Sequence, residues 1–336
     1  MRITKAAAAL ITLVIALTAC GGGGTDSGAD GDADAGYPVS ITSALGTTTI
    51  PSKPERVVTL GWGSTEAAVA LGVVPVGMRD MSSDSGTVDG ILPWVKDELK
   101  GQEPTLLAEK SDSIPYERIA ALRPDLILSV QSGLTADQFA RLTEIAPTVA
   151  QPGKAWQTSW QDQTTIVGQA LGKSDEAAEL VTEGEKRLAD VKAAHPEFAG
   201  KTVASVSVTA AGSVGYYFDT DPRVKMLAAM GFDPLPALTQ LRESAPEGTF
   251  AAQVSWENVP KYSPDVLTAW FLDSGMQSDA EGNPVFRNLR AVQQSSYVPI
   301  VDPPLVFAVS SPNVLNLPWM LDRYVPKLSD AAKAVR

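Results

Sequence analysis

Two stretches of the chain, well separated in sequence, follow the same plan. Each places an aromatic residue and a glutamate at the start of a short helical segment, in the motifs Pro115-Tyr116-Glu117 and Ser255-Trp256-Glu257. In both copies a proline follows seven residues after the glutamate and an aspartate eight residues after it, at 124–125 and 264–265, and an apolar run comes next. A plan that occurs twice in one chain predicts two lobes of similar construction.

A second pair of matching segments supports two lobes. Residues 70–75 (ALGVVP) end a helical stretch that begins near Ser64, and residues 229–234 (AMGFDP) end one that begins near Pro222. In each segment the glycine suits a left-handed C-cap, and the proline that follows prevents the helix from continuing.

Short runs of valine, isoleucine and leucine alternate with the helical segments. Such runs are typical of parallel strands that are covered on both faces. We expect strands at 57–60, 73–77, 126–130 and 148–150 in the first lobe, and at 202–208, 266–270, 297–301 and 305–309 in the second. The predicted fold class is α/β, with two α/β lobes that contain parallel-type sheets.

The longest helical signal lies between the lobes. One helix is expected over 160–171, and a second over 174–195, whose first residue, a serine, suits an N-cap. Leu180, Gly184 and Leu188 fall on one stripe of the second helix. A helix of about 22 residues is ~33 Å long, enough to join two lobes and to allow only small closing motions. The expected division is a first lobe at 38–158, connector helices at 159–196 and a second lobe at 197–336.

The amino terminus has the parts of a secretory signal. Arg2 and Lys5 precede an uncharged apolar run over 6–19, which is too short for a permanent membrane span, and Cys20 follows. This arrangement resembles the bacterial lipobox, in which the cysteine is diacylated after cleavage, and two acyl chains suffice for stable anchoring. We therefore expect a signal peptide at 1–19, and at 20–37 the lipidated cysteine with a disordered Gly/Asp tether. The alternative is a plain signal peptide with an incidental Cys20.

Composition excludes several classes of protein. Of the 336 residues one is Cys and one is His, and the formal net charge is −12. A single cysteine excludes an intramolecular disulfide framework and a cysteine-based zinc site. One histidine argues against a His-rich metal site, and His195 is better explained as a cation at the end of the connector helix. The negative charge argues against a nucleic-acid partner, which requires a basic face.

The order and spacing of several motifs resemble the ferric-siderophore and vitamin B12 type substrate-binding proteins of ABC importers. The resemblance extends from about residue 38 to the end of the chain and rests on Pro54–Val58, Glu66–Gly77, Glu117–Ile127, Ser255–Leu267 and Leu321–Tyr324. It implies two α/β lobes joined by a single long connector helix, with the ligand held in the groove between them. It also implies a monomeric binding protein rather than an enzyme, anchored by lipid to the outer face of the cytoplasmic membrane. Its partners would be a ferric siderophore and the permease of an ABC importer.

The resemblance assigns a docking role to two glutamates. In the family, the residues that match Glu117 and Glu257, one in each lobe, dock onto arginines of the permease. An exposed carboxylate at the start of a short helix offers a guanidinium a bidentate partner. The alternative is an ordinary glutamate that stabilises the N-terminus of its helix.

The ligand groove is expected just beyond the carboxyl ends of the strands, where open α/β sheets place their sites. A ferric siderophore is a bulky chelate whose iron is already six-coordinate. Its binder therefore needs aromatic faces and cationic or neutral donors, with no cofactor and no metal ligand of its own. The candidates for ligand binding are Trp62, Ser64, Arg79, Gln131, Trp156, Tyr216, Tyr217, Arg242, Trp270 and Arg287.

Other functions stay open. The same fold suits another cargo, such as cobalamin, haem or ferric citrate, or bare ferric ion held by Tyr216 and Tyr217. A secreted hydrolase is less well supported, because the segment 212–215 lacks the spacing of a G-x-S-x-G elbow. A lipoprotein that uses the fold only as an interaction module is a third alternative.

Overall fold

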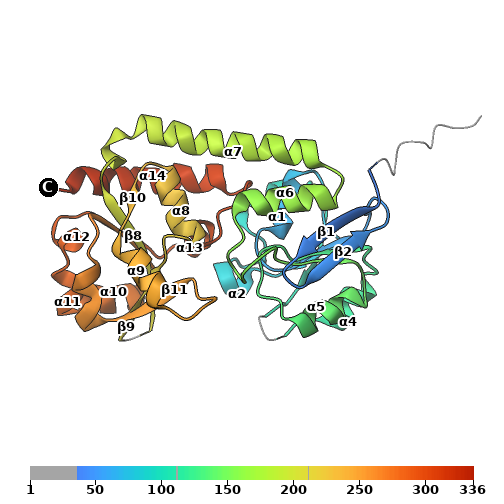
Figure 1. Ribbon diagram of the computed structural model, residues 1–336, viewed down its shortest axis with the longest axis horizontal. Coiled ribbons are helices and arrows are strands. Elements are labelled where there is room, and N and C mark those ends of the chain that lie inside the picture. Colours follow the sequence, from blue (N-terminus) through green and yellow to red (C-terminus); the bar gives the residue numbers. More distant parts are fainter. Residues whose placement is uncertain (1–35, 111–112, 211) are drawn as a thin grey trace, which may run out of the picture. The chain divides into compact units, whose positions relative to one another are not determined.

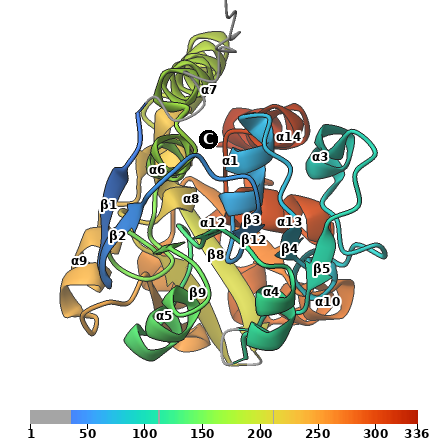
Figure 2. The ribbon, with the colours of Figure 1, turned by 90° about the vertical axis from the view of Figure 1, so that its right-hand side faces the viewer.

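The first lobe is built on a five-stranded sheet in which every neighbouring pair of strands is parallel (Figures 1 and 2). The computed structural model describes residues 36–110, 113–210 and 212–336. The strand order is β5 (Thr105–Leu107), β4 (Gly77–Arg79), β3 (Val57–Thr59), β6 (Leu126–Leu128) and β7 (Thr148–Val149). The parallel sheet predicted for this lobe is confirmed.

Alternate side chains of the central strands enter two separate cores. Leu126 and Leu128 share one core with the helices α1 (Ser64–Ala70) and α6 (Trp160–Ala170) and with the hairpin of β1 (Val39–Ser43) and β2 (Gly46–Ile50). Ile127 points to the opposite face, where α4 (Tyr116–Ala121) and α5 (Ala136–Thr143) cover the sheet. This is the two-residue period of a strand. Because both faces are covered, the carboxyl edge of the sheet is left to carry a site.

The second lobe contains a mixed sheet, which corrects the prediction of a second parallel sheet. The strand order is β11 (Ala251–Ser255), β9 (Ser213–Tyr217), β8 (Thr202–Ala210), β12 (Val266–Phe271) and β13 (Tyr297–Ile300), with β10 (Asp233–Pro234) paired to β8 outside this path. Strands β8, β12 and β13 are parallel, whereas β9 is antiparallel to both β8 and β11. The chain passes from β8 to β9 almost at once, and a connection this short joins only antiparallel strands.

Nine helical segments accompany the described strands of the second lobe. They are η2 (Pro196–Phe198), α8 (Pro222–Ala229), α9 (Ala237–Ser244), η3 (Trp256–Tyr262), α10 (Ser274–Gly282), α11 (Pro284–Arg287), α12 (Arg290–Gln293), α13 (Pro303–Ser310) and α14 (Leu317–Ala334).

Two predicted strands differ from the structure. Residues 305–309 belong to α13, so the prediction of a strand there is wrong. The Asp302 side chain accepts a hydrogen bond from the Leu305 N–H, and Pro303 occupies the first turn, as is typical of a helix start. Strand β4 begins only at Gly77, because the Val73 N–H donates to the Ala68 carbonyl and completes the end of α1.

One long helix connects the lobes. After α6, α7 (Ser174–Ala194) extends over 21 residues and packs against α6 in the first lobe and against α8 and α14 in the second (Figure 1). Leu188 is buried, and Gly184 lies so close to α6 that an added Cβ would be 2.6 Å from the Trp160 ring. The N-cap is Lys173 without a side-chain hydrogen bond, so the predicted capping role of Ser174 is wrong.

The repeated motifs occupy equivalent places in the two lobes. The Asp125 carboxylate accepts hydrogen bonds from the N–H groups of Glu55 and Arg56 at 2.8 and 2.9 Å, just before β3. The Asp265 carboxylate accepts two from Thr202, the first residue of β8, both at 2.8 Å. In each lobe, therefore, the aspartate before one central strand fixes the start of its neighbour.

The lobes share a hydrophobic core beneath the connector helix. Short helices of the first lobe, α2 (Ser82–Ser85), α3 (Pro93–Lys96) and η1 (Asp97–Leu99), lie on this side. The Trp94 ring is 5.0 Å from that of Trp319 in α14 and 6.3 Å from that of Phe307 in α13, between centroids. Aromatic packing of this kind buries apolar surface of both lobes in one core.

The predicted signal peptide, Cys20 and nearly all of the tether fall in residues 1–35, outside the described part of the chain. Of the helices that the structure describes, none combines the length and the apolar character that a membrane crossing requires.

Candidate ligand groove

A groove between the two lobes holds about 890 Å³ of empty space, its open mouth included. The first lobe contributes the loop after β3 and the segment around α2, and the second contributes α8, α13 and the end of β12. The lining residues are Trp62, Ser83, Asp84, Gly86, Arg223, Trp270, Phe271, Leu272, Pro303, Val306, Phe307 and Ser310. Trp62 and Trp270 lie at the carboxyl ends of parallel strands, the edge where α/β sheets place their ligands.

Trp62 stands at the centre of an aromatic wall. Its ring centroid is 5.1 Å from that of Trp156 and 5.2 Å from that of Phe307. Its indole Nε1 is buried and has no hydrogen-bond partner among the described residues. A buried donor without a partner is costly, so a ligand oxygen at this position would be stabilising.

The glycines on either side of Trp62 allow the loop to turn. Gly61 and Gly63 have φ angles of 67° and 74°, and an added Cβ at Gly61 would lie 2.6 Å from the Gln131 carbonyl oxygen. Only glycine adopts this left-handed conformation without strain. The Trp62 N–H then donates to that same carbonyl at 2.9 Å, which fixes the indole at the groove.

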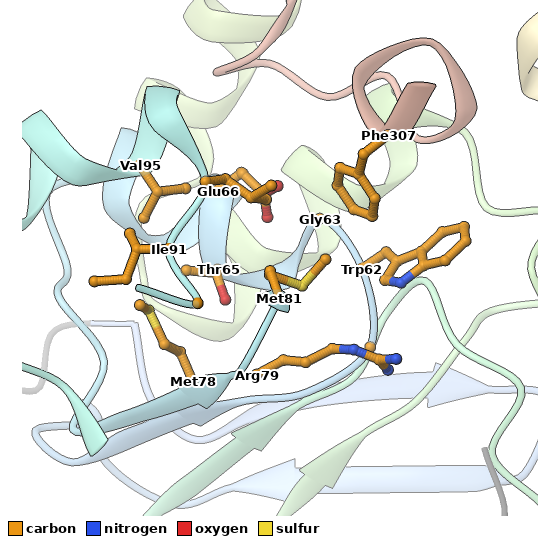
Figure 3. Close-up of a pocket in the computed structure, with 13 residues that line it drawn as sticks. Trp62, Gly63, Thr65, Glu66, Met78, Arg79, Met81, Ile91, Val95 and Phe307 are labelled. Atoms are coloured by element: carbon orange, nitrogen blue, oxygen red, sulfur yellow. The ribbon is translucent and has the colours of Figure 1, made fainter. Parts of the chain in front are cut away.

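Arg79 lies at the end of β4 in a smaller pocket that continues from the groove (Figure 3). Its guanidinium is 2.8 Å from Asp84 and 3.4 Å from Glu109. Glu109 also accepts a hydrogen bond from the Gly61 N–H at 2.9 Å. Burial raises the pKa of Glu109, and the Arg79 charge opposes this rise. Arg79 is thus already paired with acidic groups of its own lobe.

Arg223, in the first turn of α8, is a lining residue that the sequence reasoning missed. Its guanidinium stacks 4.1 Å above the Tyr217 ring, and its Nη1 lies 3.1 Å from both carboxylate oxygens of Asp221. The Nε of Arg223 is buried and has no partner among the described residues. An arginine is unfavourable in the first turn of a helix, because the helix dipole is positive there. An arginine at the start of a helix, in the sequence Asp221-Pro222-Arg223, is therefore the sequence signal that could have identified Arg223 as a functional residue.

Five predicted ligand residues lie in or beside the groove. Trp62 and Trp270 line it, and Arg79 lines the adjoining pocket. Trp156 packs on Trp62. Tyr217 is buried, and its hydroxyl accepts a hydrogen bond from the Trp270 indole at 3.1 Å.

Two predicted residues are buried supports of the first lobe. Ser64 is fully buried, and its hydroxyl accepts a hydrogen bond from the Val130 N–H at 3.1 Å. Gln131 is also buried, donates to the Trp156 carbonyl at 3.2 Å and accepts from the Thr158 N–H at 2.9 Å. Both hold the loops that carry the aromatic wall, and neither faces the groove.

The remaining three predicted residues, all in the second lobe, lie away from the groove lining. Tyr216 is fully buried against Tyr262, and burial raises the pKa of its hydroxyl. Arg242 pairs with Asp219 at 2.8 Å. Arg287 is an exposed residue of α11. Tyrosines alternate in direction along β9, which is why only one of the adjacent pair serves the groove.

Glu66 of α1 is a buried carboxyl group where the lobes meet. Its Oε1 accepts hydrogen bonds from Trp94 Nε1 at 3.4 Å and from Asn313 Nδ2 at 3.2 Å, so it links the first lobe to the segment before α14. Burial raises its pKa, although these donors act in the opposite direction. Figure 3 shows Glu66 and Phe307 bordering the same pocket.

The two candidate docking glutamates are exposed and equivalent. Glu117 lies in the first turn of α4 and Glu257 in the first turn of η3. Two residues further on, Ile119 and Val259 are buried and fix each helix to its lobe. Each carboxylate therefore projects from a rigid support.

His195 has a structural environment. Its Nδ1 is 3.0 Å from Glu197, and its ring stacks on Phe198 with centroids 5.1 Å apart. Over residues 36–110, 113–210 and 212–336, no three His, Cys, Asp or Glu side chains are grouped so that they could hold a metal ion.

The family model described as "Periplasmic binding protein" matches residues 57–298 of the chain. The probable siderophore-binding lipoprotein YfiY of Bacillus subtilis (strain 168) is 29% identical over 298 residues, which are 84% of this chain and 86% of that protein.

Two solved structures have a similar fold. PiaA of Streptococcus pneumoniae TIGR4 in complex with ferrichrome gives a TM-score of 0.80 at 29% identity and covers 89% of this chain and 100% of PiaA. SirA of Staphylococcus aureus with staphyloferrin B gives a TM-score of 0.71 at 26% identity and covers 86% of this chain and 98% of SirA.

Proposed function

We propose that this chain, which belongs to the periplasmic binding protein family, binds a ferric siderophore outside the cytoplasmic membrane. It delivers the siderophore to the permease of an ABC importer for iron uptake. The predicted family resemblance is confirmed, and so is the two-lobed α/β fold. Family members are substrate-binding proteins, which accords with a protein that carries cargo rather than transforming it.

The composition of the inter-lobe groove carries this proposal. Trp62, Trp270 and Phe307 offer broad, rigid faces to a bulky chelate. The unpartnered Nε of Arg223 offers a hydrogen bond to an oxygen of the chelate. In a siderophore the iron is fully coordinated by the chelate, so the protein needs to recognise only the shell of organic groups. We propose Trp62, Arg79, Trp156, Tyr217, Arg223, Trp270 and Phe307 as the ligand-binding residues.

Two further sites complete the proposal. Glu117 and Glu257 would pair with arginines of the permease and set the orientation of the docked protein. Cys20, outside the described residues, would be diacylated and would hold the protein at the outer face of the membrane. A Cys20→Ser variant should then appear in the soluble fraction of the cell envelope, while the unchanged protein stays with the membrane. Equal membrane retention of the two would contradict the anchor.

Tryptophan fluorescence tests the function directly, because three of the proposed ligand residues are tryptophans. We expect submicromolar quenching by a ferric siderophore when the protein is titrated with ferric hydroxamates, ferric catecholates, haem, cobalamin and ferric citrate. Quenching by haem or cobalamin alone would assign another cargo to the same fold. No response to any ferric siderophore would overturn the proposal.

A further inference from the structure

Each arginine at the groove already has an acidic partner in its own lobe. Arg79 lies 2.8 Å from Asp84 and 3.4 Å from Glu109. Arg223 lies 3.1 Å from Asp221, whose side chain is fully buried. Among the described residues that line the groove and its adjoining pocket, the only other charged side chain is Glu66, another acid. The groove therefore has no positive charge in excess.

The rest of the lining is uncharged and offers neutral hydrogen-bond donors. Leu272, Pro303 and Val306 add apolar surface, and Leu272 is 59% exposed at the groove. Two buried polar atoms of the uncharged lining residues, Trp62 Nε1 and Ser310 Oγ, have no partner within the described structure. Such groups suit carbonyl oxygens, and they do not compensate a full negative charge.

The charge of a ferric chelate depends on its iron-binding groups. A hydroxamate loses one proton when it binds iron, so three of them cancel the charge of the ferric ion. A catecholate loses two protons, so three of them leave the complex with three negative charges. Moving such a trianion out of water into a groove whose arginines are already neutralised would be strongly unfavourable.

We infer that the cargo is a ferric trihydroxamate chelate without net charge, and that the pairing of Arg79 with Asp84 and of Arg223 with Asp221 disfavours polyanionic chelates. This inference rests on the proposed function and names the substrate class of the same site. The acids beside the arginines act as specificity determinants: both arginines lose their attraction for anions, and Arg223 keeps its Nε–H donor.

Competitive titration of the purified protein with two ferric complexes tests the inference. The probes are ferrichrome, an uncharged trihydroxamate complex, and ferric enterobactin, a tris-catecholate complex. We expect ferrichrome to bind at least about tenfold more tightly, with a dissociation constant that changes less than about twofold between 0.05 and 0.5 M NaCl, because an uncharged ligand is not subject to salt screening.

An Asp84→Asn variant gives the second measurement, because it removes the acid closest to Arg79. The dissociation constant of ferric enterobactin, divided by that of ferrichrome, should fall about tenfold in this variant. The matched control is Asp89→Asn, which removes the same charge from an exposed residue paired with Lys96 outside the groove, and should leave the ratio unchanged.

Three results would overturn the inference in distinguishable ways. Equal or tighter binding of ferric enterobactin by the unchanged protein would overturn the substrate class and leave the proposed function in place. An unaltered ratio in a folded Asp84→Asn variant would show that the acid does not determine specificity. Binding of neither complex, nor of any other ferric siderophore, would overturn the proposed function together with the inference.

Discussion

At the scale of single residues, Arg223 shows how a side chain can be held firmly by one set of contacts while one of its donors is left without a partner. Asp221 neutralises its charge and Tyr217 supports the plane of its guanidinium, while the Nε stays without a partner in the described structure. The planar fork of an arginine makes this division possible, and the rounded ammonium of a lysine does not. Arg223 therefore contributes a directed hydrogen-bond donor rather than an excess positive charge.

A conservative change isolates that contribution. Arg223→Lys keeps the ion pair with Asp221, so we expect the protein to remain folded, but it removes the Nε donor and the stacking on Tyr217. Affinity for the ferric siderophore should fall about tenfold, or ~1.4 kcal/mol, in a fluorescence titration. Arg242→Lys is the control, because Arg242 pairs with Asp219 away from the groove lining. The affinity of this control variant for the ferric siderophore should stay within about twofold of that of the unchanged protein. Equal losses in the two variants would contradict the role of Arg223.

Glu66 gives a residue-scale prediction about pH. Its pKa is raised in the folded protein, so the carboxyl group favours folding when protonated, and this stabilisation is lost as the pH rises from about 4.5 through the folded pKa. Glu66→Gln keeps an oxygen acceptor for Trp94 and Asn313 without the buried charge. Urea unfolding at pH 7.5 should therefore show the variant to be the more stable protein, and the difference in the free energy of unfolding should shrink toward pH 5. If the difference in the free energy of unfolding stays constant or grows toward pH 5, the buried charge of Glu66 is not the cause of the difference in stability.

At the scale of elements, the helices with strong end signals were predicted well. Gly72 and Gly231 have φ angles of 77° and 111° at the ends of α1 and α8, as the two matching segments predict. The strands β9 and β11 were missed, because the segments Ser213–Tyr217 and Ala251–Ser255 contain no apolar run. The pattern of residues 305–309 predicts a strand, whereas they form part of a helix, because a short apolar run has the same appearance in a strand and in a buried helix.

The connector helix contains a glycine, Gly184, that close packing requires although glycine is a poor helix former. An alanine at this position tests which of the two effects is larger. Gly184→Ala would gain up to about 1 kcal/mol of propensity. The added Cβ would meet the Trp160 ring at 2.6 Å, however, and overpacking of this kind typically costs about 1–3 kcal/mol. We expect a net loss in the free energy of unfolding, measured by urea titration. The control Gly282→Ala, at the end of α10 with nothing within 4 Å of the added Cβ, should be neutral or stabilising.

At the scale of the whole binding unit, Gly36–Arg336, function depends on how two lobes of one plan present their matching surfaces. The sequence repeat predicted this plan, and Asp125 and Asp265 show that it extends to individual hydrogen bonds. The groove composition was only half predicted: Ser64, Gln131 and Tyr216 are buried away from the groove, and Arg242 and Arg287 lie outside its lining. A sequence places residues at the end of a strand, but the direction of each side chain depends on the loop that follows.

The paired glutamates give the prediction that belongs to this scale. Glu117 and Glu257 are exposed on separate lobes and take no part in the groove, so ligand binding and docking should be separable. The double variant Glu117→Ala, Glu257→Ala should abolish uptake of labelled iron by cells, while the purified protein binds the ferric siderophore with unaltered affinity. Each single variant should retain partial uptake, because an exposed ion pair contributes only about 0.2–1 kcal/mol. Glu179→Ala with Glu183→Ala, two exposed glutamates of α7, removes the same charge and should leave uptake intact. If the control lowers uptake as much as the docking variant does, general negative charge guides the protein to its permease, and the two matched positions have no special role.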